Sequence, residues 1–381
     1  MLKLSLLSRL GSLRVISIAG SILTPIIDHR LVPYPYMMTF VTTRRCNSRC
    51  KMCNIWRDKT SPFLSLDQID HIFRRNNFSF VRILTLTGGE PSLRPDLPEV
   101  LKIIGTYCPN LELIQLATNG LRPAYILEQV RQMLNWVEAE LKSVYRFDVQ
   151  VSIDGIGEIQ DWVRGMPGAF QRVAETLDQL AALRRDFPKM RIRLSAVVLP
   201  YNLPHVEALQ AFASERGLPI TFTPVILSNE YYGNLQNRDL LSFSSVDQRV
   251  QAAEFFHRLA CWEQSSLRHH YKDVNRMLLG SPRQRKCMMG FYGFVVEYNG
   301  DVYSCVNCEK YSFGNLLDTR FEELWFRPRA SYVRQQVYRN CCPTCTSLCY
   351  PLPTNLAEVV DTALRRLITS LQGIQVKKID R

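Results

Sequence analysis

The chain has 381 residues, of which 46% are hydrophobic and 22% are charged, and these values exclude bulk disorder. This length accommodates one large α/β domain and a smaller module. Its 47 Lys and Arg against 35 Asp and Glu give a formal net charge of +12. Such a charge suits a nucleic acid, an anionic small molecule or an anionic membrane surface, and selects none of them.

The N-terminal segment, residues 1–36, is expected to be amphipathic. Lys3, Arg9 and Arg14 accompany leucines at helical spacing, and they precede an apolar run at 15–27. That run superficially resembles a signal peptide, but it is shorter than the about 20 residues that a helix needs to cross a bilayer. Two interpretations stay open: a basic helix on a membrane interface, or a helix that caps the open end of a barrel.

Short apolar runs alternate with helix-like segments from residue 37 to residue 227. The predicted strands are 37–41, 81–86, 111–117, 147–153, 191–199 and 220–227. The predicted helices are 67–75, with Ser65 as N-cap, and 97–104, 125–144, 170–185 and 206–216. This alternation predicts a parallel sheet of βα units, and six units fit a partial (β/α)6 barrel better than a closed one of eight strands.

Polar or glycine-containing segments follow four of these strands. They are the cysteine loop at 46–53 and the segments 87–91, 118–120 and 152–155. Loops at the carboxyl ends of parallel strands build the active sites of such folds. We therefore expect these segments to lie together at one site.

Cys46, Cys50 and Cys53 form the densest chemical signal in the chain. Soft thiolates select zinc, copper(I) or iron–sulfur clusters. A structural zinc or a fully protein-ligated cubane takes four cysteines, and the next cysteine is Cys108. Three local ligands would leave one metal corner open, which is typical of a catalytic site.

The Cx3Cx2C spacing after a first strand resembles the signature of the radical S-adenosylmethionine (radical SAM) superfamily. The resemblance covers about residues 37–227. It implies a [4Fe–4S] cluster held by the three cysteines, with S-adenosylmethionine chelating the fourth iron. It also implies reductive cleavage of that cofactor to a 5′-deoxyadenosyl radical, which abstracts a hydrogen from a substrate.

The resemblance implies further contacts to S-adenosylmethionine. Gly88, Gly89 and Glu90 are similar to the motif that binds its amino group, and glycines allow a close backbone approach to a ligand. The other residues at family positions, near the carboxylate, ribose or pocket wall, are Ser152, Asp154, Arg164 and Asn119. For Asn119 a simple turn role stays open. The family often has an aromatic residue before the third cysteine, whereas this chain has Met52, whose thioether can fill the same space.

The C-terminal part begins with a helical linker over 240–279. A β-hairpin is predicted around Gly300 and Asp301, and an amphipathic helix over 356–371. The predicted domains are 1–36, the radical SAM partial barrel at 37–235, a helical linker at 236–281, a cysteine-rich β-hairpin/helix module at 282–353 and the C-terminal helix at 354–381.

The cysteines of this module resemble the auxiliary-cluster modules named SPASM and twitch. A full SPASM pattern has seven cysteines with an x5 gap that this chain lacks, so a single auxiliary [4Fe–4S] cluster is predicted. The expected ligands are Cys287, Cys305, Cys342 and Cys345, with Cys349 as substitute and Cys308 or Cys341 left open. A zinc ribbon from the same thiolates is the alternative. Cys108 and Cys261 are expected to be core residues.

The predicted function is therefore a radical SAM oxidoreductase, or a related radical transformation, with an auxiliary cluster for electron transfer. We expect a small anionic, sugar-like or lipid-linked substrate. Peptide-modifying members often carry an N-terminal leader-binding domain. Only 45 residues precede Cys46, too few for that domain beside a first strand, so a ribosomal peptide substrate is less expected. A maturase of a ribosomal peptide or protein stays open, and a zinc-binding nucleic-acid protein is a distant alternative.

The expected partners and compartment follow from the same residues. Basic residues near the first cluster favour an anionic electron donor such as flavodoxin or ferredoxin, or they form a solvated face; they are Arg44, Arg45, Arg49, Lys51 and Arg57. No nucleic-acid partner is expected. Clustered CxxC-type thiols indicate the reducing cytoplasm and disfavour disulfides, with peripheral membrane contact left open.

Overall fold

The computed structural model describes residue 32 and residues 34–58, 62–263, 265–285, 287–307, 311–339 and 345–347. The predicted C-terminal helix and nearly all of the N-terminal segment lie outside these residues. The chain divides into two compact units. One contains Phe243–Tyr292 together with both chain ends, and the other contains Tyr34–Ser242 and Gly293–Val333.

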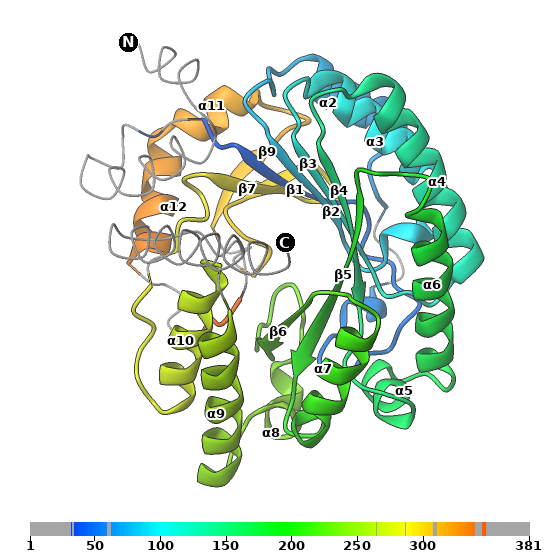
Figure 1. The fold of residues 1–381 in the computed structure, drawn as a ribbon. Coiled ribbons are helices and arrows are strands. Elements are labelled where there is room, and N and C mark those ends of the chain that lie inside the picture. Colours follow the sequence, from blue (N-terminus) through cyan, green and yellow to red (C-terminus); the bar gives the residue numbers. More distant parts are fainter. Residues whose placement is uncertain are drawn as a thin grey trace, which may run out of the picture. The chain divides into compact units, whose positions relative to one another are not determined.

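The second unit is built on a nine-stranded sheet in the order β6-β5-β4-β3-β2-β1-β7-β8-β9 (Figure 1). Its strands are β1 Met37–Val41, β2 Ile83–Thr87, β3 Leu113–Thr118, β4 Arg146–Ser152, β5 Met190–Val198, β6 Ile220–Pro224, β7 Gly293–Val296, β8 Asp301–Tyr303 and β9 Ser312–Asn315. All neighbours from β6 to β1 pair in parallel. The predicted partial barrel of six βα units is confirmed.

The predicted hairpin is also confirmed, because β7 pairs with β8 in antiparallel fashion. Its placement goes beyond the sequence prediction. Strand β7 pairs in parallel with β1, with Met37 opposite Gly293 and Phe40 opposite Val296. The cysteine-rich segment thus continues the barrel sheet on the far side of β1.

Helices of this unit lie along the outer face of the sheet, as α2, α3, α4 and α6 show in Figure 1. The α-helices are α2 Leu66–Arg74, α3 Leu97–Tyr107, α4 Pro123–Glu140, α5 Glu158–Arg164, α6 Ala169–Leu183, α7 Val206–Glu215, α8 Arg238–Leu241 and α11 Phe321–Phe326, and α12 Pro328–Tyr338 starts in this unit. The 3-10 helices are η2 Ile55–Arg57, η3 Pro91–Leu93, η4 Leu203–His205 and η5 Leu235–Asn237. The predicted Ser65 N-cap is confirmed, since its side chain accepts a hydrogen bond from the Gln68 amide in a capping box.

The strands alternate between an apolar and a polar face. In β5, Ile192, Leu194 and Ala196 are buried, whereas Arg193 and Ser195 between them are half-buried. Successive side chains of a strand point to opposite faces. The apolar side therefore packs under the helices, and the inner face of the partial barrel is polar.

The other unit contains α9 Val246–Trp262 and α10 Leu267–Leu278. Ser245 caps α9 with a second capping box, and buried aromatic rings of the two helices, Phe256 and Tyr271, pack together. The sequence prediction for Cys261 is wrong: this thiol is exposed on α9, with its Sγ 3.7 Å from His257 Nε2. The prediction for Cys108 is confirmed, because it is fully buried after α3.

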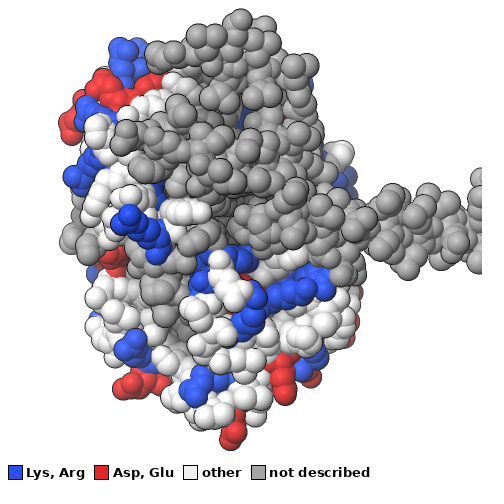
Figure 2. All heavy atoms as spheres, turned by 90° about the vertical axis from the view of Figure 1, so that its left-hand side faces the viewer, with Lys and Arg blue, Asp and Glu red and all other residues white. Residues whose placement is uncertain are grey.

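The face drawn in Figure 2 carries Lys and Arg side chains near its middle, whereas Asp and Glu lie mostly toward its edges. This agrees with the positive net charge of the whole sequence. Among the described residues, no helix is both long and apolar enough to cross a membrane.

Candidate functional site

The three-cysteine loop directly follows β1 and pairs with the end of β2. Gly89 N–H donates to Thr43 O at 2.7 Å, and Glu90 N–H donates to Arg45 O at 2.9 Å. A Cβ on Gly88 would lie 2.3 Å from Thr43 O. The glycines are therefore required for this close backbone approach between the two loops.

Helix α5, which the sequence analysis did not predict, supports the opposite side of the loop. The last carbonyls of a helix have no intrahelical partner. Here the Arg164 carbonyl accepts from the Arg49 amide at 3.0 Å, and the Val163 carbonyl accepts from the Lys51 amide at 2.9 Å. Gly165 ends the helix with φ +61°, and a Cβ there would lie 2.3 Å from Arg49 O.

A third support comes from the segment after β6. Asn234 is fully buried, and its Nδ2 donates to Met52 O at 2.7 Å. Asn54 N–H donates to Tyr232 O at 2.7 Å, and Asn54 Nδ2 donates to Gly233 O. This segment uses its Asn234 side chain and its carbonyls to hold the cysteine loop.

The cysteine thiols are mostly shielded from solvent. Burial first, and then the neighbouring Cys50, raise the pKa of both Cys46 and Cys53 to about 12. Ser48 Oγ lies 3.0 Å from Cys50 Sγ, and Arg164 Nη1 donates to the same sulfur at 3.7 Å. A metal that binds these groups must displace their protons, and a guanidinium nearby favours the thiolate form.

The two acidic residues predicted to contact the cofactor, Glu90 and Asp154, both bind other groups of the protein. Glu90 is fully buried, and its carboxylate accepts from Ser92 N–H, Thr118 Oγ1 and Asn119 N–H at 3.2, 2.8 and 2.6 Å. Burial raises its pKa, and these donors oppose that shift. Its carboxylate joins the ends of β2 and β3, and the carbonyls of the glycine pair are further acceptors at this loop.

Asp154 has a comparable role after β4. Its Oδ1 accepts from Val197 N–H at 2.8 Å, and its Oδ2 lies 2.6 Å from Arg164 Nη2. Burial alone would lower the pKa of Arg164, but Asp154 and Cys50 raise it above the ordinary value. The Arg164 guanidinium therefore stays charged beside the thiols, within an ion pair that is neutral as a whole.

The structure brings Asn119 to the cysteine loop as well. Its Nδ2 donates to Asn47 Oδ1 at 2.7 Å and lies 3.9 Å from Cys46 Sγ. Ser152 ends β4 and is half-buried. Met52 packs in an apolar cluster with Leu199 and Leu241.

The auxiliary cysteines are only partly described. Cys305 follows β8 and is 9% exposed, and its sulfur accepts from Asn307 N–H at 3.4 Å. Cys345 accepts from Ser347 N–H at 3.5 Å, and Cys287 is half-buried. The predicted ligand Cys342, the substitute Cys349, and Cys308 and Cys341 lie outside the described residues.

The residues present at the first loop fit an iron–sulfur cluster. Among the described residues, no three His, Cys, Asp or Glu side chains converge on one metal ion. A [4Fe–4S] cluster does not need such convergence, because each thiolate binds its own iron. All described cysteines are free of disulfide bonds, and three of them share one shielded loop beside a buried arginine.

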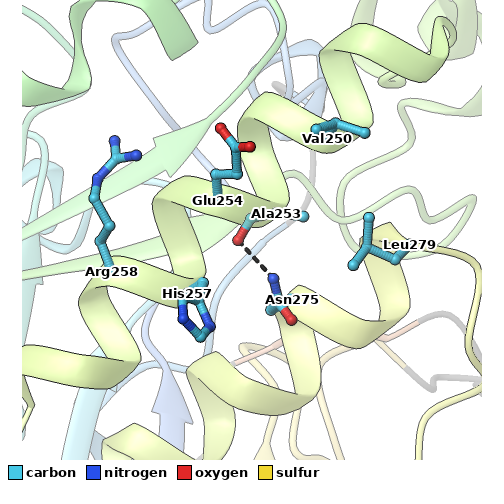
Figure 3. Close-up of a pocket in the computed structure, with 7 residues that line it drawn as sticks. All are labelled: Val250, Ala253, Glu254, His257, Arg258, Asn275 and Leu279. Atoms are coloured by element: carbon cyan, nitrogen blue, oxygen red, sulfur yellow. Dashed lines mark hydrogen bonds between the residues drawn. The ribbon is translucent and has the colours of Figure 1, made fainter.

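A separate hollow of about 360 Å³ lies between α9 and α10. Figure 3 shows Val250, Ala253 and His257 on α9 beside Asn275 of α10 and Leu279, which follows α10. Asn275 Nδ2 donates to Ala253 O at 2.7 Å. None of the residues predicted from motifs lines this hollow.

Sequence reasoning missed the residues that hold the loop from a distance. Tyr231 donates its hydroxyl to Gly88 O at 2.9 Å across 143 residues, and Asn202 Nδ2 donates to Asp154 O and Val197 O. No spacing pattern signals such contacts.

Comparisons with known proteins agree with this geometry. The radical SAM superfamily model matches residues 40–213, and the iron–sulfur cluster-binding SPASM domain model matches residues 287–350. Mycofactocin maturase MftC of Mycobacterium ulcerans is 26% identical over 82% of this chain and 80% of its own length. The GTP 3′,8-cyclase of Yersinia pestis is 26% identical over 56% of this chain, which spans 62% of that relative.

Solved structures show the same fold. Streptococcus suis SuiB bound to S-adenosylmethionine aligns with a TM-score of 0.56 at 13% identity, covering 80% of this chain and 69% of SuiB. Native anSMEcpe with bound AdoMet aligns with a TM-score of 0.56 at 17% identity, covering 90% of this chain and all of anSMEcpe.

The partial barrel and its cysteine loop are those of an iron–sulfur enzyme. Within that class the chain belongs to the radical SAM superfamily and carries a SPASM domain. Its cofactors are S-adenosylmethionine, the [4Fe–4S] cluster of the radical SAM domain and auxiliary iron–sulfur clusters in the SPASM domain.

Proposed function

We propose that this enzyme abstracts a hydrogen atom from a small anionic, hydroxylated substrate, sugar-like or lipid-linked, and that one auxiliary [4Fe–4S] cluster transfers an electron. When bound and reduced, the first cluster and S-adenosylmethionine supply a 5′-deoxyadenosyl radical. We place the reaction in the cytoplasm, where clustered thiols stay reduced. We further propose the domain boundaries predicted from the sequence, and a peripheral membrane contact made by residues 1–36.

The proposed ligands of the first cluster are Cys46, Cys50 and Cys53. The carbonyls of Gly88 and Gly89 would accept from the cofactor ammonium, while Glu90 orients the end of β3. Ser152 and Asn119 would contact its polar groups. The Arg164 guanidinium, held in place by Asp154, would donate to the thiolates and to the cofactor carboxylate. The proposed auxiliary ligands stay Cys287, Cys305, Cys342 and Cys345, with Cys349 as substitute.

The observation that carries the substrate class is the charge of the inner sheet face. Asp148 on β4 is fully buried and binds two guanidinium groups, those of Arg146 and Arg193. Its Oδ2 lies 3.5 Å from Arg193 Nη1, whose side chain is 31% exposed. Two cations on one anion leave a net positive charge, and half-buried Gln150 and Ser195 on the same strand pair add hydrogen-bonding groups.

The test is a substrate search that measures 5′-deoxyadenosine release with dithionite as reductant. Sugar phosphates, nucleotides and isoprenoid phosphates form one panel, and deuterated substrates trace the abstracted hydrogen. We expect an anionic compound to stimulate release, and Arg193→Gln to weaken that stimulation. Arg185→Gln, an exposed position after α6, is the control. Equal stimulation in both variants would contradict the substrate class.

A peptide or protein substrate is the second candidate. Its support is that mycofactocin maturase MftC aligns with 82% of this chain, and that one structural neighbour is SuiB bound to its precursor peptide SuiA. Transfer of deuterium from a labelled peptide into 5′-deoxyadenosine, with no response to the anionic panel, would favour this function.

For the electron donor we propose an acidic one-electron carrier such as flavodoxin or ferredoxin. Arg49 and Arg57 are exposed and lie 5.7 and 5.4 Å from the Trp56 ring centre. Lys51 Nζ lies 5.4 Å from the Trp162 ring. Arg44 is not part of this face, because its side chain is 17% exposed and lies beside Glu297.

The donor face is tested with the double variant Arg49→Gln/Arg57→Gln. Its reduction by flavodoxin at low salt should slow by about tenfold, because steering by surface charge acts on the encounter rate. Reduction by dithionite should stay unchanged. Arg131→Gln on α4, also exposed, is the matched control. Unchanged rates with flavodoxin would exclude this face.

A further inference from the structure

Tyr231 connects two parts of the site although it lies far in sequence from every motif. Its hydroxyl donates to Gly88 O at 2.9 Å. Its ring is 7% exposed and packs in an apolar cluster with Val41 and Ile55, and Cys46 and Cys53 lie against that cluster. The tyrosine thus touches both the glycine motif and the surroundings of the thiols.

The segment that carries Tyr231 is itself fixed in place. The adjacent Tyr232 carbonyl accepts from Asn54 N–H at 2.7 Å, and Asn234 Nδ2 binds Met52 O. On its other side, Arg44 lies 6.0 Å from the Tyr231 ring centre and 3.6 Å from Glu297 Oε2. A side chain held on this many sides can set the direction of the group that it binds.

We propose that Tyr231 is a positioning residue that fixes the Gly88 carbonyl for the amino group of S-adenosylmethionine. This inference rests on the proposed function of the glycine pair. A carbonyl oxygen has two lone pairs, so it accepts the phenol and an ammonium together. The Glu90 carboxylate already accepts from three protein donors, so the Gly88 carbonyl is a further acceptor at this motif, and its orientation matters for the ammonium.

The test is Tyr231→Phe, which keeps the ring and removes only the hydroxyl. After anaerobic reconstitution, its iron and sulfide content and the electron paramagnetic resonance spectrum of the reduced cluster without cofactor should match the wild type. The S-adenosylmethionine concentration that half-converts this spectrum should rise by about three- to tenfold, the value of one lost hydrogen bond. The adjacent Tyr232→Phe, whose hydroxyl is not the Gly88 donor, should titrate as the wild type does.

The outcomes separate this inference from the proposed function. If S-adenosylmethionine does not alter the wild-type spectrum, the proposed cofactor site fails. If it alters wild type and Tyr231→Phe at equal concentrations, the positioning role alone is wrong. A loss of iron in Tyr231→Phe would also overturn it, because the hydroxyl would then be needed for loop structure and not for cofactor orientation.

Discussion

The Glu90 side chain serves protein structure at a position where the motif suggests ligand contact. Its two oxygens accept three hydrogen bonds, from Ser92, Thr118 and Asn119, and none of these donors is in the cysteine loop. A buried acceptor that loses its complementary donors leaves polar groups unpaired, which is expensive in free energy.

Replacement of Glu90 by glutamine is therefore expected to destabilise the fold. The new amide group would face donors instead of accepting from them, and the loss should be about 1.5–3 kcal/mol in the free energy of unfolding. Chemical denaturation of the full chain measures it. Glu112→Gln is the control, because Glu112 forms a half-exposed ion pair with Arg82 at 3.1 Å and should cost less than about 1 kcal/mol. Equal losses would contradict the role of Glu90.

His270 on α10 gives a pH-dependent prediction. Burial first, then Arg285 and Arg283, lower its pKa from the ordinary 6.5 to about 3. Between these values the unfolded chain binds more protons than the folded one, so stability falls as pH decreases below 6.5 and is unaffected above it. We expect a loss of up to about 1.4 kcal/mol per pH unit from this group.

Thermal unfolding at pH 7 and pH 5 tests this dependence, since ordinary Asp and Glu remain charged over that range. His270→Phe should show a smaller decrease in melting temperature between the two pH values than the wild type. The same decrease in both proteins would show that His270 does not control it.

Two helix ends differ in what surrounds their glycine. Gly165 after α5 and Gly217 after α7 have φ of +61° and +60°. A Cβ at Gly165 would meet Arg49 O at 2.3 Å, whereas nothing lies within 4 Å of one at Gly217. The backbone strain is thus matched, and only the contact with the cysteine loop differs.

Alanine at both positions separates strain from loop support. Gly217→Ala should lose about 1 kcal/mol of stability and retain its iron, because the left-handed conformation alone is penalised. Gly165→Ala should in addition lose cluster iron after reconstitution, because the loop must move away from α5. Iron assays with thermal unfolding measure both effects, and full iron retention in Gly165→Ala would refute the support by α5.

The elements of the barrel could be predicted because each has its own local signal. Strand β1 was predicted at 37–41 with the observed bounds, and the ends of β5 moved by one residue each. Helix α5 was missed, because it is short and its neighbours Asp154 and Gly155 read as a turn. The pairing of β7 with β1 could not be predicted, since it joins residues more than 250 positions apart and neither strand encodes its partner.

The location of the candidate site could be predicted from the sequence, but the role of each side chain could not. Its motifs lie at strand ends, so the barrel rule alone brings Cys46, Gly88 and Asn119 together. Glu90 and Asp154 bind neighbouring strand ends, and Tyr231 binds the Gly88 carbonyl. These contacts depend on side-chain directions that no spacing specifies. The motif therefore identified the location of the site more fully than the function of each side chain.

At the scale of the whole molecule, the core of the sheet does not depend on the thiols. The strands pack through fully buried apolar residues such as Phe40, Leu84 and Phe147, and the cysteine-rich segment joins them through β7. A variant that lacks the three loop cysteines should therefore fold and keep its auxiliary site, because the free energy of folding comes mainly from apolar burial.

Iron analysis tests this together with the number of auxiliary clusters. Reconstituted wild type should hold about eight iron atoms, and the Cys46→Ala/Cys50→Ala/Cys53→Ala variant about four, because each cubane holds four. Circular dichroism should show unchanged helix content in the variant. Eight atoms retained in the variant would establish two auxiliary clusters and contradict the single one predicted. Loss of all iron would show instead that the auxiliary site depends on the loop, against the independence that the sheet core implies.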